Sequence, residues 1–370
     1  MDLLISSPST CKIGHSILHS IPLTSTHRQC HFLHTSRKEK YHFSTLSSLS
    51  MDTSTSPEIV GDYSPFLRIY KDGRIERLKG TDVVPPSLDD PNSSVLSKDV
   101  VYSPEENLVS RLYLPKNIDP NKKIPLLVYF HGGGFCIDTP FSANYHNYVY
   151  SLVSEAKVVA VSVDYRRAPE HPLPIAYDDS WTALNWVASH VNEDGPEQWL
   201  NVHTDLGKVF LAGDSAGANI AHQIALRCGQ QKLQGINVAG AVLIHPYFWG
   251  KEPIGEEAQE VEVRRTISAV WYFACPTTSG CDDPLINPVV DPNLASLGCS
   301  RVLVIVAEKD MLRDRGWLYY DELKKSGWNG EVEIMEAKEE NHVFHLENFA
   351  CENAVAMLKR IASFFNEAQA

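Results

Sequence analysis

The sequence predicts a doubly wound α/β fold, and the pattern of apolar runs, the helical stretches between them and the overall composition all support this. Short apolar runs rich in β-branched residues suit strands buried on both faces of a mostly parallel sheet. They span 124–130, 158–163, 209–212, 241–244 and 302–306. Stretches with helical character alternate with them, at 175–190, 216–229, 314–326 and 349–366. Of the 370 residues, 43% are hydrophobic and 21% charged, which is typical of a globular chain.

The charge, the cysteines and the hydropathy exclude several classes of protein. A net charge of −13 argues against a basic surface that binds nucleic acid. No run approaches 18 apolar residues, so we expect no transmembrane helix. The eight cysteines form no CxxC pair, and no histidine cluster has zinc-ligand spacing. We therefore expect no disulfide framework and no structural metal site.

The first 50 residues differ from the rest of the chain. They hold 11 Ser, 5 Thr and 6 His, and five basic residues against two acidic ones give a net charge of +3. A Ser- and Thr-rich, acid-poor, mildly basic segment resembles an organellar transit peptide. The alternatives are a disordered extension and an upstream start codon misassigned ahead of Met51. We expect a plastid location if 1–50 is a transit peptide, and otherwise a cytoplasmic one.

Strand and turn signals also appear outside the central pattern. Residues 67–70 and 75–78 flank Asp72-Gly73, which favours the positive φ angles of a tight hairpin turn. A further strand is expected near 110–114, and another at 331–335. No long linker interrupts the chain after residue 51, so 51–370 is expected to form one domain.

A candidate nucleophile lies between the run at 209–212 and the helix expected at 216–229. The segment Gly213-Asp214-Ser215-Ala216-Gly217 has the Gly-x-Ser-x-Gly pattern in the strand, turn and helix context that this pattern requires. Its glycines let strand and helix approach closely, which would present Ser215 at the end of the sheet. The alternative is a simple strand-to-helix turn with a capping serine.

A glycine-rich segment follows the run at 124–130. In His131-Gly132-Gly133-Gly134-Phe135 the backbone is free to turn its N–H groups toward a developing oxyanion. An oxyanion hole would combine Gly132, Gly133 and Gly134 with the N–H of Ala216. Phosphate binding is the alternative, but no Gly-Lys-Ser/Thr follows, and the glycine spacing does not match a dinucleotide-binding motif.

A serine nucleophile needs a base and an acid that orients the base. Asp310 follows the run at 302–306, and His342 follows the strand expected at 331–335, so both occur in the required order after Ser215. Other candidates remain open at this point. Asp314 and Glu308 are rival acids, His345 is the rival base, and His222 and His245 read as structural histidines. The pairs Asp178-Asp179 and Arg166-Arg167 read as structural or surface pairs.

Together these motifs resemble the plant carboxylesterase family, in the hormone-sensitive-lipase group of α/β-hydrolases. The resemblance runs from about Met51 to the C-terminus and rests on 67–78, 131–135, 163–174, 213–217, 307–316 and 342–345. It implies an α/β-hydrolase fold and a serine esterase that acts on small carboxylic esters without a cofactor. It also implies that Ser215, Asp310 and His342 form the catalytic triad. A helical cap is implied over the site, built from segments near 51–66 and 250–285.

The same family includes proteins with other functions, and these stay open as alternatives. One group resembles 2-hydroxyisoflavanone dehydratases, which eliminate water at the hydrolase site. Another resembles tuliposide-converting enzymes, which form a lactone by intramolecular acyl transfer and are plastid-targeted. A third group, the gibberellin receptors, replaces the triad histidine with an aliphatic residue. Because His342 is present, we expect an enzyme and not a receptor.

Overall fold

The computed structural model describes residues 58–91 and 93–367. The predicted leader at 1–50 lies outside these residues, as does the first part of the cap segment expected near 51–66. Both therefore stay predictions.

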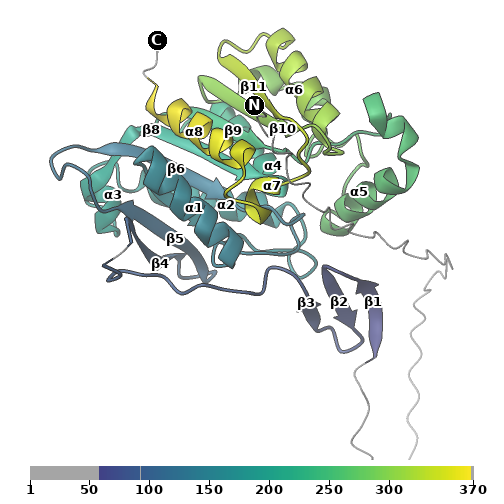
Figure 1. Cartoon of the computed structure of the whole chain (residues 1–370), viewed down its shortest axis with the longest axis horizontal. Helices are drawn as coiled ribbons and strands as arrows, with labels where there is room; N and C mark the ends of the chain where they lie inside the picture. The colour runs from purple at the N-terminus through teal and green to yellow at the C-terminus, as the bar shows by residue number, and fades with distance from the viewer. Residues whose placement is uncertain (1–57, 92, 368–370) are drawn as a thin grey trace, which may run out of the picture. The chain divides into compact units, whose positions relative to one another are not determined.

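A mostly parallel sheet of eight strands forms the centre of the fold (Figure 1), in the order β11-β10-β9-β8-β6-β7-β5-β4. Its six parallel strands are β6 (Ile124–Phe130), β7 (Val159–Val163), β8 (Thr204–Asp214), β9 (Val238–Ile244), β10 (Arg301–Ala307) and β11 (Glu331–Ala337). Two antiparallel strands, β5 (Leu108–Pro115) and β4 (Val95–Ser103), complete one edge. The predicted α/β fold and each predicted strand are confirmed; β4 was not predicted.

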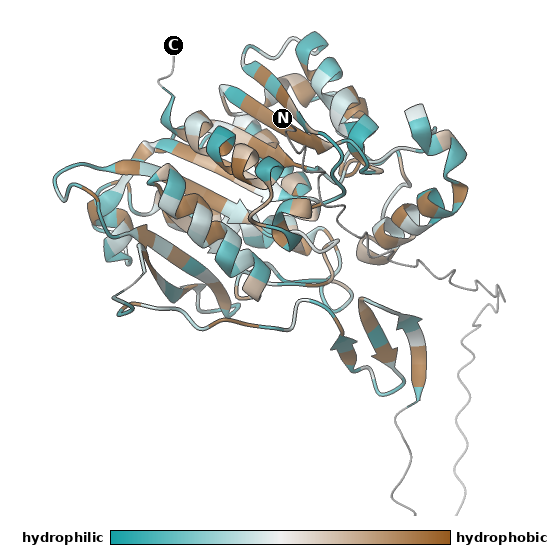
Figure 2. Cartoon of the chain, viewed as in Figure 1, coloured by the Kyte–Doolittle hydropathy of each residue, from teal (hydrophilic) through white to brown (hydrophobic). Residues whose placement is uncertain are grey.

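Helices cover both faces of this sheet, because alternate residues of each strand point to opposite sides. Leu127 and Tyr129 belong to one apolar core, with α1 (Ala143–Ala156) and α8 (Glu352–Asn366). Leu126 and Val128 belong to the other core, with α2 (Ile175–Ala188), α4 (Ala216–Gln230) and α6 (Arg313–Lys325). The hydropathy colouring in Figure 2 follows this pattern, with apolar strands between mixed helices.

Two smaller segments lie outside the central sheet. One is an antiparallel sheet of β1 (Ile59–Tyr63), β2 (Leu67–Tyr70) and β3 (Ile75–Arg77), which contains the predicted hairpin. The other holds the 3₁₀ turn η1 (Gly255–Gln259) and helix α5 (Val261–Ala274). The rings of Tyr63 and Phe273 link the two segments, with centroids 4.9 Å apart. The described part of 51–66 is strand and turn, whereas 250–285 contains helix α5, so the helical part of the expected cap corresponds to the second segment.

Shorter elements complete the chain: α3 (Gln198–His203), η2 (Pro288–Val290), η3 (Leu294–Ser296) and α7 (Phe344–Glu347). Among the residues that the structure describes, no helix is both long and apolar enough to cross a bilayer.

Candidate active site

The candidate nucleophile Ser215 occupies the sharp turn between β8 and α4. Its backbone is in the left-handed region, with φ at 52°, which is unusual for a residue with a side chain. The flanking glycines make this turn sterically accessible. A Cβ atom on Gly217 would lie 2.0 Å from the carbonyl oxygen of Phe130, and one on Gly213 would lie 2.5 Å from the same atom. The strand and helix therefore approach as closely as the sequence pattern predicted.

The candidate base and acid lie beside this serine. His342 follows β11, and its Nε2 is 3.0 Å from Oγ of Ser215. Its Nδ1 is 2.7 Å from Oδ2 of Asp310, which follows β10. The backbone N–H of Leu312 donates to the other carboxylate oxygen of Asp310 at 2.9 Å and fixes its orientation. An unbroken hydrogen-bond chain thus joins the three residues that the sequence singled out.

The charges of the acid and the base reinforce each other. Burial raises the pKa of Asp310, but the neighbouring His342 outweighs burial and holds that pKa below its usual range. For His342, burial lowers the pKa, but the carboxylates of Asp310 and Asp214 outweigh it and raise the pKa above 6.5. An ionised Asp310 can only accept, so Nδ1 of His342 carries the proton, and its Nε2 is left to accept from Ser215.

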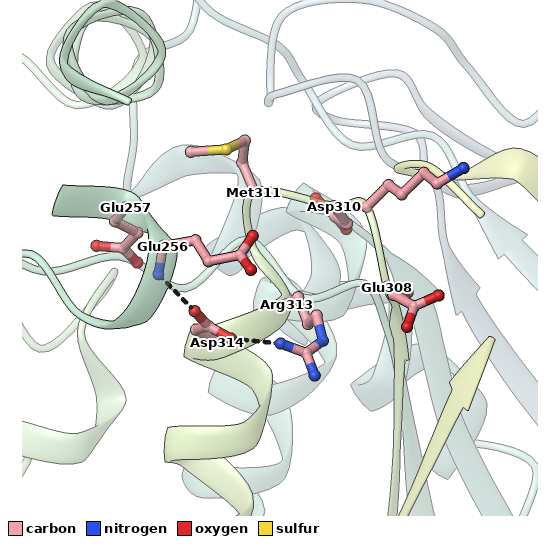
Figure 3. A pocket seen from close by; sticks show the side chains of 8 residues that line it. Glu256, Glu257, Glu308, Asp310, Met311, Arg313 and Asp314 are labelled. Atoms are coloured by element: carbon pink, nitrogen blue, oxygen red, sulfur yellow. Dashed lines mark hydrogen bonds and ion pairs between the residues drawn. The ribbon is translucent and has the colours of Figure 1, made fainter. Parts of the chain in front are cut away.

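The rival acids have other partners. All three acid candidates line one small cavity, which has a volume of about 50 Å³. Figure 3 shows the side chains that line it. There Asp314 accepts from Arg313 at 2.9 Å and from the backbone N–H of Glu256 at 3.1 Å. Glu308 is exposed at 33% of its side chain and pairs with Lys338. Only Asp310 reaches His342.

The rival base and the other histidines lie off the chain of hydrogen bonds. His345 is buried against the ring of Tyr148, and burial lowers its pKa to about 3. His222, inside α4, lies 3.1 Å from the Tyr319 hydroxyl. Asp179, from the sequence pair Asp178-Asp179, is buried and forms an ion pair with Arg166, from the pair Arg166-Arg167, so these two residues have a structural role.

His245 has a larger part in the site than its sequence interpretation suggested. It lies at the end of β9, and its Nδ1 accepts the backbone N–H of Val343 at 2.9 Å. Val343 follows His342 directly and has a left-handed φ of 49°. His245, Asp310 and His342 place three ligand-type atoms within 4.8 Å of one another. Within this cluster His342 is hydrogen-bonded to Asp310, and His245 is hydrogen-bonded to the backbone N–H of Val343.

The glycine-rich segment lies against the turn that carries Ser215. The N–H of Gly132 donates to the hydroxyl of Tyr145 at 2.9 Å. Gly133 and Gly134 have φ angles of 90° and 60°. In the described part of the chain, the N–H groups of Gly133, Gly134 and Ala216 have no hydrogen-bond acceptor. Three of the four predicted donors are therefore available to a ligand, and Gly132 is already used.

Asp214 and two tyrosines were not recognised from the sequence. The carboxylate of Asp214 is fully buried and accepts from the hydroxyls of Tyr129 and Tyr145, each at 2.8 Å. Burial raises its pKa to about 6 in spite of these hydrogen bonds. The position of Asp214 next to the serine was its one sequence signal. The tyrosines are 85 and 69 residues away along the chain, so no local pattern pointed to them.

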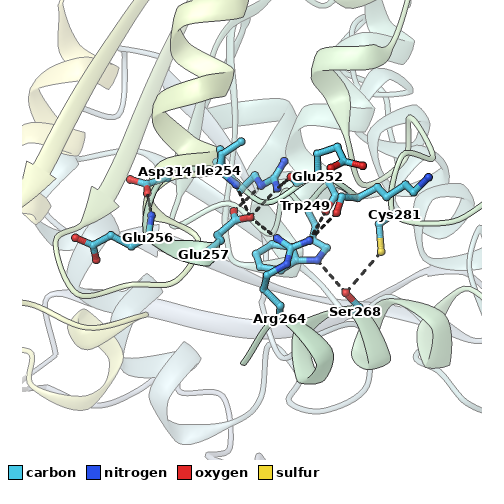
Figure 4. Close-up of polar contacts among 12 residues, drawn as sticks. Trp249, Glu252, Ile254, Glu256, Glu257, Arg264, Ser268, Cys281 and Asp314 are labelled. Carbon is cyan, nitrogen blue, oxygen red and sulfur yellow. Dashed lines mark hydrogen bonds and ion pairs between the residues drawn. The ribbon is translucent and has the colours of Figure 1, made fainter. Parts of the chain in front are cut away.

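The segment with η1 and α5 reaches the glycine-rich segment and is anchored by buried charges. A Cβ on Gly134 would lie 3.1 Å from a methyl group of Val270 in α5. The hydroxyl of Tyr247 donates to the carbonyl of Ile267 at 2.6 Å. Figure 4 shows Glu257 of η1 among the polar groups of this segment, and Arg264 and Arg315 both donate to its carboxylate.

Comparison with known proteins agrees with this fold and these motifs. A family model described as alpha/beta hydrolase fold matches residues 127–346. The chain is 51% identical to "Probable carboxylesterase 7" of Arabidopsis thaliana, over 84% of this chain and 99% of that one. It is 45% identical to the 2-hydroxyisoflavanone dehydratase of Glycine max, over 83% and 98%. Among solved structures it is similar to a hyperthermophilic esterase from the archaeon Pyrobaculum calidifontis. The TM-score is 0.62 at 27% identity, with 73% and 84% of the two chains covered.

Proposed function

Because the chain belongs to the α/β-hydrolase family and is a carboxylic ester hydrolase of the carboxylesterase type, we propose that Ser215, His342 and Asp310 are its catalytic triad. The substrates would be small carboxylic esters. The observation that carries this proposal is the hydrogen-bond chain from Ser215 through His342 to Asp310 at the carboxyl ends of three parallel strands.

In the first half of the reaction, Ser215 attacks the ester carbonyl. Nε2 of His342 takes the serine proton and then gives it to the leaving alcohol, which leaves an acyl-enzyme. Asp310 stabilises the imidazolium formed in between and keeps the ring oriented. In the second half, water attacks the acyl-enzyme and gives its proton to His342, and the acid is released as Ser215 recovers its hydroxyl.

Backbone N–H groups stabilise the tetrahedral oxyanion in both halves. We assign this role to Gly133, Gly134 and Ala216, whose N–H groups have no acceptor within the described residues. Fixed donors of this kind are typically the largest single contribution to acyl-transfer catalysis. We further propose that α5 and the small sheet of β1 to β3 act as a cap over the site. The contact between Val270 and Gly134 and the ring contact between Tyr63 and Phe273 support this.

The test is the hydrolysis of p-nitrophenyl acetate and p-nitrophenyl butyrate by the full chain. We expect Ser215→Ala and His342→Ala each to reduce kcat by about 10⁴-fold or more, because the triad acts as a unit. Far-UV circular dichroism and the melting temperature control for folding. Turnover by the Ser215→Ala variant at the rate of the unsubstituted protein would contradict the proposal.

The dehydratase relatives favour a second candidate, elimination of water from a β-hydroxy ketone such as a 2-hydroxyisoflavanone. In such a reaction a base removes a C–H proton, the oxyanion donors stabilise the enolate, and hydroxide leaves. His342 would be needed but not a serine nucleophile. Elimination that survives Ser215→Ala and is lost in His342→Ala would favour this candidate, whereas loss of ester hydrolysis in both variants favours the esterase.

A further inference from the structure

We infer that Tyr145 is a positioning residue for the oxyanion-binding amides: its hydroxyl fastens the glycine-rich segment to the buried carboxylate beside the nucleophile. The inference rests on the proposed function, since it concerns the same donors. Nothing in the sequence motifs pointed to Tyr145, which lies in α1 and belongs to the apolar core that α1 and α8 form on one face of the sheet.

The Tyr145 hydroxyl makes two hydrogen bonds of opposite direction. It donates to Oδ2 of Asp214 at 2.8 Å and accepts the N–H of Gly132 at 2.9 Å. Burial raises the pKa of Tyr145 well above 10, so its proton stays in place and the direction of the first bond is fixed. The segment also packs tightly on this pair, because a Cβ on Gly132 would lie 2.4 Å from Oδ2 of Asp214 and 2.8 Å from the Tyr145 hydroxyl.

A second tyrosine fixes the same peptide groups from the other side. The hydroxyl of Tyr165 lies 2.7 Å from the carbonyl oxygen of His131 and 3.1 Å from that of Gly132. The His131 carbonyl and the Gly132 N–H belong to one peptide plane, so that plane is bound at both ends. The Gly132 carbonyl and the Gly133 N–H belong to the next plane, so its orientation sets the direction of the Gly133 N–H.

The hydrogen bonds of the two tyrosines restrict a segment that its glycines would otherwise leave flexible. Three successive glycines have no side chains to restrict φ and ψ, so an unanchored segment would sample many directions of its N–H groups. Catalysis by an oxyanion hole depends on donors that are already oriented before the charge develops. The hydrogen bonds of Tyr145 and Tyr165 supply that orientation, and the link from Tyr145 to Asp214 places the segment relative to Ser215.

Tyr129 offers a matched control. It is buried like Tyr145, and it donates to the other oxygen of Asp214 at the same distance of 2.8 Å. In the described residues it makes no bond to the glycine-rich segment. Tyr129→Phe therefore removes one donor to Asp214 and nothing else, whereas Tyr145→Phe removes one donor to Asp214 and also the acceptor of the Gly132 N–H.

The experiment compares Tyr145→Phe, Tyr129→Phe and Ser215→Ala in the full chain. We expect Tyr145→Phe to reduce kcat for p-nitrophenyl acetate about 10-fold, less than the full loss of one oxyanion donor, with little change in KM. Inhibition by phenylboronic acid, which forms a tetrahedral adduct with a serine nucleophile, should weaken by a similar factor. Tyr129→Phe should stay within about 3-fold of the unsubstituted protein in both measurements while losing similar thermal stability.

Equal losses of kcat and of boronic acid affinity in the two tyrosine variants would overturn the inference, because both would then act only through Asp214. A loss confined to KM or to the melting temperature would overturn it as well. The Ser215→Ala variant distinguishes a failure of the Tyr145 inference from a failure of the proposed esterase function. If Ser215→Ala keeps its turnover, the esterase proposal fails; if it is inactive while the tyrosine variants behave alike, only the role of Tyr145 fails.

Discussion

The central strands and the η1–α5 segment are stabilised in different ways. Strands β7 and β9 are buried along their whole length, and most residues of their neighbours β5, β6, β8 and β10 are buried. In α5, by contrast, only Trp271 and Ala274 are fully buried. Polar contacts add to the apolar packing of this segment: the carboxylate of Glu257 accepts from two guanidinium groups, and the Tyr247 hydroxyl donates to a backbone carbonyl.

This difference indicates that the strand ends and the η1–α5 segment have different roles. Ser215, Asp310 and His342 each directly follow, or lie close behind, a strand of the apolar core, where close packing leaves little room for displacement. Val270, which lies next to Gly134 of the glycine-rich segment, comes from the η1–α5 segment, which the ion pairs of Glu257 help to hold in place. Changes at the strand ends should therefore alter the rate of the chemical step, and changes in the anchors should alter stability and access to the site.

The largest effect is expected at a strand end. Asp310→Asn should reduce kcat by about 10⁴-fold, because the amide favours the wrong tautomer of His342. Steady-state kinetics on p-nitrophenyl butyrate measures this. Asp314→Asn is the matched control in the neighbouring helix and should leave kcat nearly unchanged. A kcat for Asp310→Asn within 10-fold of the unsubstituted protein would contradict the expectation that changes at the strand ends alter the rate of the chemical step.

The next effect belongs to the polar anchor. Glu257→Gln leaves the buried guanidinium of Arg315 and the partly buried one of Arg264 without a counter-charge, and it should reduce the free energy of unfolding by about 3 kcal/mol. We expect KM to change more than kcat. Urea unfolding gives the stability, with Glu262→Gln as the control, since Glu262 is 74% exposed in its pair with Arg265. Equal stability of the two variants would show that the buried charges do not anchor the segment.

A smaller effect is expected at the small sheet. Arg77 in β3 donates to the carbonyl of Cys136 at 2.7 Å and forms a two-point pair with Glu170. Arg77→Ala should cost about 1.5 kcal/mol of stability. Arg68→Ala, which loses a more exposed partner in Asp62, should cost less, and thermal denaturation can separate the two. The opposite order would mean that β1 to β3 are fastened elsewhere.

The smallest effect concerns pH. His342 must be neutral to accept the serine proton, and its pKa is raised above 6.5, so kcat/KM should fall as the pH drops through a value above 6.5. The same shift stabilises the fold below pH 6.5, and that contribution disappears as the pH rises through the pKa of the folded state. Asp214→Asn removes one of the charges that raise this pKa and should move the acid limb of the profile to lower pH.

The profile of Asp314→Asn serves as the control for that shift, because this carboxylate is not among the groups that act on His342. An acid limb that stays in place in Asp214→Asn would show that the charge of Asp214 does not contribute to the pKa of His342.

The sequence predicted the core well because burial there leaves a simple pattern. Runs such as β10, which are apolar on both faces, are typical of central strands in a covered sheet. Helix α1 was missed although Tyr145, Tyr148, Val149 and Leu152 have helical spacing, because polar residues and aromatic rings interrupt the apolar signal. Strand β4 was missed for a related reason: its polar and charged residues suit a sheet edge and resemble a loop.

The same distinction applies to the site. Ser215, His342 and Asp310 were predicted because each follows a recognisable element in a fixed chain order. The bonds from Tyr145 to Gly132 and from His245 to Val343 depend on which side chains the folded sheet brings together. The use of the Gly132 N–H by a tyrosine could not be anticipated from a row of glycines. Hydrogen bonds of this kind depend on tertiary packing, and no local sequence pattern indicates them.

The order of the site residues along the chain also has a consequence for biosynthesis. His342 comes 127 residues after Ser215, so the ribosome completes the glycine-rich segment and the nucleophile turn well before the base exists. During that interval the serine has an ordinary, unreactive hydroxyl. If Ser215 and His342 act as proposed, a nascent chain cannot form an acyl-enzyme with cellular esters, and a product that ends before residue 342 has no esterase activity. Catalysis would then begin only when β11 and the loop that follows it have joined the sheet.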